Sequence, residues 1–290
     1  MDFSTQRLMR WSRLAAAALQ IAIALCCASA RAADRQEQSD AAAPRALPAV
    51  EVRALRDPVE KSYRKIVQGM DLFERQRHRA PQASLRFKLL PRDRGTNMEG
   101  IALGIVGDSV DITVPVAPDN TFALERVAQA LKEDAVVTPN RRARSMTWRT
   151  DIRTPGLPPN TRRLGDLRLE CVVGMEAGLV SNARSVVAEI TRLVTDAGYC
   201  DQRVPEYLFF AERPLWSVTL VHGSRREILS VDHLWGGISR EPMTAGDLRY
   251  CDCEVLLDRT YYAPLGDSTW PDDTLLELEY MDETRERRPG

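Results

Sequence analysis

Residues 146–171 constrain the fold most, because they combine a two-residue periodicity with a loop that cannot be regular structure. Apolar and polar residues alternate at residues 146–153 and again at residues 167–173. This period points alternate side chains to opposite faces and predicts two half-buried strands. The segment between them, residues 154–164, contains three prolines, which lack a backbone donor and fix φ. We therefore expect two strands joined by an ordered surface loop.

Residues 1–32 have the pattern of an export signal. Three arginines precede an apolar run at residues 14–28, and small residues at the end of this segment offer a cleavage site. The run is shorter than the roughly 20 residues of a membrane-spanning helix, and no later stretch approaches that length. We predict that the signal peptide is removed and that the mature protein is periplasmic or secreted. An uncleaved anchor is the alternative.

The charge of the chain argues against a nucleic-acid partner. The formal net charge is −1, and it becomes −4 when residues 1–32 are removed, because they carry four arginines and one aspartate. An acidic balance gives no overall attraction to a phosphate backbone. The sequence leaves the oligomeric state open.

The remaining residues divide by periodicity into a helix and two folded modules. A capping box, Asp57-Pro58-Val59-Glu60, begins an amphipathic helix, and seven short period-two runs then predict a β-sandwich. After it, a helical run at residues 181–197 precedes strands near residues 207–211, 215–221, 227–231, 250–257 and 274–281. The predicted fold class is α+β and mostly β, in the order signal peptide 1–32, disordered tether 33–55, amphipathic helix 56–80, seven-stranded β-sandwich 81–178, a smaller α+β module with an antiparallel sheet 179–284, and a tail 285–290.

Arginines gather around the two strands and the loop at residues 146–171. Guanidinium groups can grip a carboxylate or a phosphate with a planar pair of donors, so we expect them to bind an anionic envelope component or an acidic protein partner. The alternative is that they only solvate an outer sheet face. Exposed charges add little stability, so changing both loop arginines to Glu should leave thermal stability nearly unchanged. The candidates are Arg141, Arg142, Arg144, Arg149, Arg153, Arg162 and Arg163, of which Arg162 and Arg163 lie in the loop.

Two Gly-Asp-Ser triplets raise the alternative of a serine hydrolase. The run Ile105-Val106-Gly107-Asp108-Ser109 resembles the nucleophile block of the GDSL hydrolases, and Gly266-Asp267-Ser268 repeats the triplet. That family places a helix after the serine, whereas residues 110–116 alternate as a strand, and its late Asp-x-x-His block is missing. We favour β-turns at both places and predict no catalytic residue, cofactor or metal. An envelope hydrolase that uses Ser109 or Ser268 is the alternative function.

Two further resemblances bear on fold and location. The run that ends at Leu124, Pro-Val-Ala-Pro-Asp-Asn-Thr-Phe-Ala-Leu, is similar to the turn and strand of transthyretin-like carboxypeptidase-regulatory modules, with Asn120 in place of the usual glycine. This resemblance implies a β-sandwich. A second resemblance is to uncharacterised secreted proteins of Gram-negative bacteria, and it is carried by the export signal together with Arg153-Thr154-Pro155-Gly156, Arg163-Leu164-Gly165-Asp166-Leu167 and Trp270-Pro271-Asp272-Asp273. It implies an extracytoplasmic location.

Four cysteines follow the predicted cleavage site, and an even number in an exported chain indicates disulfides. They are Cys171, Cys200, Cys251 and Cys253. Cys251 and Cys253 lie two apart on a predicted strand, where an extended backbone makes a bond between them difficult. We expect Cys200 to pair with one of these two and Cys171 with the other. A zinc site that adds His222 or His233 is the alternative.

Overall fold

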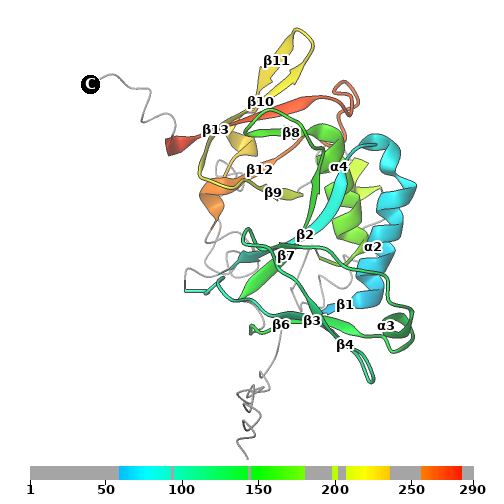
Figure 1. Cartoon of the computed structure of the whole chain (residues 1–290). Helices are drawn as coiled ribbons and strands as arrows, with labels where there is room; N and C mark the ends of the chain where they lie inside the picture. The colour runs from blue at the N-terminus through cyan, green and yellow to red at the C-terminus, as the bar shows by residue number, and fades with distance from the viewer. Residues whose placement is uncertain are drawn as a thin grey trace, which may run out of the picture. The chain divides into compact units, whose positions relative to one another are not determined.

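A computed structural model describes residues 59–92, 95–142, 145–179, 198–201, 207–235 and 256–282. They form a mixed α+β fold made mostly of strands, as the alternation predicts (Figure 1). The predicted signal peptide, the tether, the helix at residues 181–197 and the tail lie outside the described residues. None of the helices in the described ranges has the length and apolar character needed to cross a membrane.

Residues 61–139 contribute helix α2 and a sheet with the order β1-β6-β3-β4. The side chain of Ser62 caps α2 by accepting a hydrogen bond from the backbone N–H of Lys65 over 3.4 Å. The predicted helix begins near Asp57, but residues 61 and 62 pair with β6, so the observed helix begins later. The elements are β1 (Lys61–Ser62), α2 (Tyr63–Arg75), the 3-10 helix η1 (Arg77–Arg79), β3 (Leu103–Val106), β4 (Asp111–Val114), α3 (Ala128–Lys132) and β6 (Val136–Pro139).

A second antiparallel sheet has the order β5-β2-β7. Its strands are β2 (Ser84–Pro91), β5 (Thr121–Phe122) and β7 (Met146–Arg153). Strand β7 confirms the strand that the alternation at residues 146–153 predicts. Phe87, Phe122 and Trp148 meet in the core, with ring centroids 5.6 Å apart in each neighbouring pair. Such tilted and edge-on contacts favour close aromatic packing.

The second half of that stretch is not a strand. The residues predicted to alternate in a strand at 167–173 belong to helix α4 (Leu164–Glu176), in which every residue from 164 to 174 is buried. A helix that is buried all round has no polar face, so its sequence carries no 3.6-residue period. The prediction of a strand is therefore wrong, and the seven-stranded sandwich is not confirmed.

The polar residues of α4 are buried because each has partners. The guanidinium group of Arg168 donates to the carbonyl oxygens of Leu265, Asp267 and Trp270 and to the carboxylate of Asp272 over 2.7 to 3.0 Å. Buried charges persist in proteins when they are paired and hydrogen-bonded. The alternation of leucine with charged residues thus reflects polar contacts on several sides of one helix.

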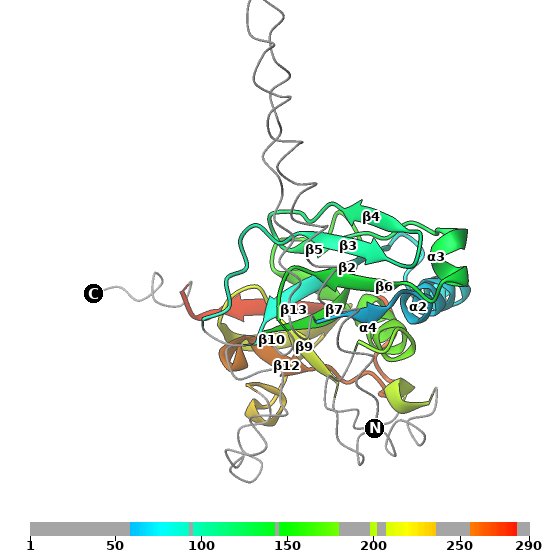
Figure 2. The same ribbon diagram turned by 90° about the horizontal axis from the view of Figure 1, so that it is seen from below.

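Helices α2 and α4 lie side by side, as both views show (Figure 1 and Figure 2). Gly69 allows this approach, because a Cβ at this position would lie 2.8 Å from the Cβ of Ala177 and 3.0 Å from the carbonyl oxygen of Val173. The small residue thus permits close contact between the two helices.

The last part of the chain forms a sheet with the order β11-β10-β13-β8 and a two-stranded sheet of β12 and β9. Strand β8, which follows the proline-rich loop, pairs antiparallel with β13, so Arg162 lies opposite Leu276. The strands predicted near residues 207, 215, 227 and 274 are confirmed. The elements are β8 (Thr161–Arg163), η2 (Tyr199–Asp201), β9 (Leu208–Phe210), β10 (Leu215–His222), β11 (Arg225–Ile228), η3 (Val231–His233), η4 (Leu257–Arg259), β12 (Thr260–Tyr262) and β13 (Leu275–Tyr280).

One disulfide links α4 to η2. It joins Cys171 to Cys200, with their Cα atoms 5.9 Å apart, and both residues are buried. A disulfide is confirmed, but the predicted pairing of each with Cys251 or Cys253 is wrong. That pairing placed Cys171 on a strand, whereas the residue lies inside a buried helix next to η2. Cys251 and Cys253 lie outside the described residues.

Candidate functional site

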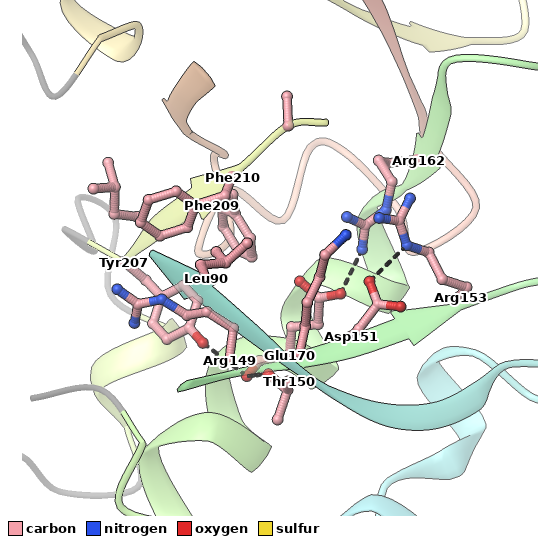
Figure 3. A pocket seen from close by; sticks show the side chains of 13 residues that line it. Leu90, Arg149, Thr150, Asp151, Arg153, Arg162, Glu170, Tyr207, Phe209 and Phe210 are labelled. Atoms are coloured by element: carbon pink, nitrogen blue, oxygen red, sulfur yellow. Dashed lines mark hydrogen bonds and ion pairs between the residues drawn. The ribbon is translucent and has the colours of Figure 1, made fainter. Parts of the chain in front are cut away.

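A small cavity of about 40 Å³ lies among β2, β7, β9, β8 and α4. Charged side chains from β2, β7, β8 and α4 surround it, and an aromatic segment around β9 closes another side (Figure 3). The volume is enough for about three water molecules or one small ionic group, since a single water needs roughly 10 to 15 Å³. The lining residues are Lys88, Leu90, Arg149, Thr150, Asp151, Arg153, Arg162, Glu170, Tyr207, Leu208, Phe209, Phe210 and Ala211.

The pairing of β2 with β7 sets the charged face. Lys88 lies directly opposite Arg149, and both line the cavity. Opposite residues in an antiparallel pair project from the same face, and like charges in these positions destabilise a sheet. The ammonium group of Lys88 acts through space on Asp119 and Asp151, whose pKa values it helps to lower, while the Arg149 guanidinium carbon lies 4.9 Å from the centre of the Phe210 ring. The fold therefore holds two cations side by side at the cavity.

A buried ion pair forms the far wall. The guanidinium group of Arg162 donates to the carboxylate of Glu170 over 2.6 Å, and their side chains are only 4% and 6% exposed. Arg162 also donates to the carbonyl oxygen of Ile152 over 3.1 Å, and Glu170 accepts from the N–H of the same residue over 2.8 Å. The pair thus clamps the backbone of β7.

Burial and charge act on the pKa values of this pair in opposite senses. Burial acts to lower the pKa of Arg162, but the Glu170 carboxylate outweighs it and raises that pKa, so the guanidinium stays charged. Burial raises the pKa of Glu170, and Asp151 adds to this rise while Arg162 opposes it. The Glu170 side chain accepts a hydrogen bond from Arg162 and one from the N–H of Ile152, as an ionised carboxylate does.

A second acid, Asp151, is somewhat less deeply buried than Glu170. Asp151 accepts a hydrogen bond from Arg153 over 2.8 Å. Burial acts to raise the pKa of Asp151, but Arg153 and Arg162 outweigh it, so the pKa lies below its ordinary value. In Figure 3 Asp151 and Glu170 lie between Arg153 and Arg162 on one side and Arg149 on the other. Four cations thus line the cavity with two acids, which leaves positive charge in excess.

The aromatic side of the cavity is also anchored to α4. The hydroxyl of Tyr207 donates to the carbonyl oxygen of Glu170 over 3.2 Å, and burial raises the pKa of Tyr207. The ring of Tyr207 packs against Phe209 with centroids 5.0 Å apart. The phenol therefore positions the aromatic segment and remains protonated near neutral pH.

The structure brings together three of the seven predicted arginines, Arg149, Arg153 and Arg162. Arg162 is buried, so the interpretation of it as an exposed loop charge is wrong. Lys88 was missed because it lies far from the arginines in the sequence, and Glu170 because residues 167–173 were predicted to form a strand, although it follows Arg162 by only eight residues. The aromatic segment carried no charge signal. Of the other candidates, Arg141 donates to backbone carbonyl oxygens of residues 97 and 99, Arg142 is exposed, Arg163 lines a separate groove, and Arg144 lies outside the described residues.

Ser109 does not have the partner of an activated nucleophile. Its hydroxyl and its backbone N–H both donate to the carboxylate of Glu133 in the turn between β3 and β4. Hydrogen bonds from Ser109 lower the pKa of Glu133 to about 2. A general base is most effective when its pKa lies near the working pH, so this carboxylate is too weak a base.

Ser268 lies in an open groove of about 570 Å³ together with His78 and Asp201. Asp201 is paired with Arg79 over 3.3 Å, and no hydrogen bond joins Ser268 to His78 among the described residues. A nucleophile needs a base that a third group orients. The residue types of a triad are present in the groove, but they are not connected. The described part of the chain also holds no group of three or more His, Cys, Asp or Glu side chains that could bind a metal ion.

Comparison of the chain with family models, with curated proteins and with solved structures finds no match. Its function must therefore be inferred from the geometry of its sites.

Proposed function

We propose that the chain is a non-catalytic, exported protein that binds an anionic group of an envelope component or of a protein partner at the cavity between β2, β7 and β9. The observation that supports this most is the placement of Lys88 opposite Arg149 on one sheet face beside the cavity. Two like charges in this position cost stability. A bound anion would offset that cost, so the arrangement favours a ligand with negative charge.

The size of the cavity limits what enters it. A volume of about 40 Å³ accommodates one carboxylate or phosphate group but not a whole sugar ring or a peptide segment. The ligand would therefore insert only a charged end, and its remainder would lie outside. The acids Asp151 and Glu170 are each engaged by an arginine, so they reduce the attraction for an anion without cancelling it.

Export is supported by two independent features. Residues 1–32 have the pattern of a signal peptide. The Cys171–Cys200 disulfide suits an oxidising compartment such as the periplasm, because thiols are kept reduced in the cytosol.

Binding of simple anions tests the proposal directly. Titration calorimetry with sodium phosphate and with sodium acetate, at one fixed ionic strength, should detect binding of at least one of them. When the titration is repeated at higher ionic strength, the affinity should fall. Lys88→Gln should weaken binding at least tenfold. Arg142→Gln, which removes an exposed charge outside the cavity, should leave the affinity within twofold. An absence of binding by the native protein, or an equal loss in both variants, would contradict the proposal.

The choice between an envelope component and a protein partner needs a separate experiment. Cross-linking in the intact envelope, followed by identification of the species attached to the chain, distinguishes the two. Lys88→Gln should reduce the yield of the attached species, and Arg142→Gln should not.

The alternative is an envelope serine hydrolase, and the groove that holds both Ser268 and His78 is the observation that favours it. A fluorophosphonate probe should leave the native protein unlabelled if the binding function is correct. Stoichiometric labelling that disappears in Ser268→Ala would establish the hydrolase instead, and loss in Ser109→Ala would place the nucleophile in the β3–β4 turn.

A further inference from the structure

A separate groove of about 420 Å³ lies beside the proline-rich loop that precedes β8. Its volume falls within the roughly 300 to 1,000 Å³ of small-molecule sites, which are mostly apolar and contain few polar groups. Three of its seven lining residues are apolar, two are polar and uncharged, and two are charged, so the groove combines an apolar surface with a few polar groups. The lining residues are Pro81, Gln82, Thr154, Leu157, Arg163, Asp273 and Leu275.

Arg163 is the cation of this groove. It follows Arg162 on β8, and because successive side chains of a strand point to opposite faces, Arg162 enters the buried ion pair while Arg163 faces the groove. Arg163 is half-buried, and within the described residues its guanidinium group makes no hydrogen bond or ion pair. It acts on Asp166 only through space. A half-buried guanidinium group beside apolar walls is therefore left with its donors unused.

Contacts within the protein hold two lining residues of the groove, Thr154 and Arg163, in position. The backbone N–H and the hydroxyl of Thr154 donate to the buried carboxylate of Asp166 over 2.8 and 2.7 Å, which ties the start of the loop to α4. Arg163 is held by the pairing of its backbone opposite Leu275 on β13. A site whose parts are already positioned loses less entropy when it binds.

We propose that this groove binds an aliphatic monocarboxylate, with the carboxylate on Arg163 and the hydrocarbon chain against Pro81, Leu157 and Leu275. Guanidinium groups bind carboxylates through two parallel N–H donors. The apolar side chains give the hydrocarbon a surface that excludes water. This site is distinct from the cavity at Lys88 and adds a second ligand class to the proposed function.

Asp273 adds a negative charge to the lining of the groove. Its carboxylate lies 3.4 Å from Nε2 of His222, and its side chain is 64% exposed, so solvent screens its repulsion of a ligand anion. Arg163 attracts a dianion more strongly to the same degree that Asp273 repels it, so charge alone does not separate a carboxylate from a phosphate. The preference for an aliphatic carboxylate rests on the apolar side chains of Pro81, Leu157 and Leu275.

Titration calorimetry with octanoate, decanoate and dodecanoate below their micelle concentrations tests the proposal. The Kd should fall about fourfold for each added methylene, which corresponds to about 0.8 kcal/mol for each buried CH₂. Decyltrimethylammonium, which has a similar chain and the opposite charge, should bind at least tenfold more weakly than decanoate.

Four variants assign the binding to the groove. Arg163→Gln should raise the Kd of decanoate at least tenfold, and Arg163→Lys should raise it less because it keeps the charge but loses the paired donors. Asp273→Asn should lower the Kd, and Lys88→Gln should leave it unchanged. A Kd that does not depend on chain length, or that is the same in the native protein and in Arg163→Gln, would overturn the proposal. Because Lys88→Gln affects only the anion cavity, failure of this site and failure of the proposed function give different results.

Discussion

Arg162 and Glu170 form an ion pair of 2.6 Å that is almost fully removed from solvent, and it joins β8 to α4. The same two side chains hold the N–H and the carbonyl oxygen of Ile152. The pair therefore connects three elements, strand β8, helix α4 and strand β7.

Removal of one member of this pair should destabilise the protein strongly. Arg162→Met leaves the carboxylate of Glu170 buried without its cation, and breaking a buried pair in this way costs about 3 to 5 kcal/mol. Equilibrium unfolding in urea measures the change, with Arg142→Met as the exposed control that should stay within about 0.5 kcal/mol. The double variant Arg162→Met, Glu170→Leu should recover much of the loss. A change below about 1 kcal/mol in Arg162→Met would mean that the pair is solvated in solution.

Loss of the disulfide should also lower stability. Cys171 and Cys200 are 29 residues apart, and closure of a loop of this length stabilises a fold by about 3 to 4 kcal/mol in the chain-entropy description. The double variant Cys171→Ala, Cys200→Ala should therefore unfold at a lower urea concentration than the oxidised native protein. Non-reducing peptide mapping provides the direct check, and a peptide that links Cys200 to Cys251 or Cys253 would contradict the observed pairing.

The hydrogen bonds of Ser109 should be visible in the titration of Glu133. They lower the pKa of Glu133 from its ordinary value of 4.5 to about 2. A lowered pKa means that the carboxylate contributes stability above pH 4.5, and that this contribution is lost as the pH falls through about 2. Ser109→Ala should move the pKa upward toward 4.5, which carbon-detected NMR of the Glu133 carboxyl can follow. A pKa that stays near 2 in the variant would show that Ser109 is not its cause.

A methyl group at Gly69 should destabilise the contact between α2 and α4. Alanine favours a helix over glycine by up to about 1 kcal/mol, but the added Cβ would meet Ala177 at 2.8 Å, and overpacking costs about 1 to 3 kcal/mol. We expect Gly69→Ala to be neutral or destabilising and Gly69→Val to be clearly destabilising. Urea unfolding tests this, and the double variant Gly69→Ala, Ala177→Gly should be more stable than Gly69→Ala alone. If Gly69→Ala is stabilising by itself, the helices separate easily and the close contact is unimportant.

The sequence correctly predicts those elements that have one face in the apolar core and the other face in a polar environment. Strand β7 buries Trp148 and Ile152 on one face and carries Arg149 and Arg153 on the other, so its alternation is read correctly. Helix α4 is buried on every side from residue 164 to residue 174, and because Asp166, Arg168 and Glu170 each have partners inside the protein, its pattern imitates a strand. The error at α4 then misplaced Cys171 and led to the wrong disulfide pairing.

The candidate site could be predicted only in part for a related reason. The run of arginines identified Arg149, Arg153 and Arg162 because they are close in the sequence. Lys88 enters the site through the register of β2 against β7, and Glu170 through its partner on β8. The first relationship leaves no local pattern, since it depends on how distant segments pair. The second joins residues only eight apart, but it was hidden because residues 167–173 were predicted to form a strand.

The pairing of β8 with β13 has a consequence for the order in which the chain acquires its structure. Arg162 lies opposite Leu276, so this pairing joins two segments that are far apart in the sequence. Contacts between residues so far apart form late, because a long loop must be closed before they provide any stabilisation. A growing chain that has not yet produced β13 therefore lacks the strand that covers β8. Until β13 is available, residues 161–163 lack the partner strand that satisfies their backbone hydrogen bonds.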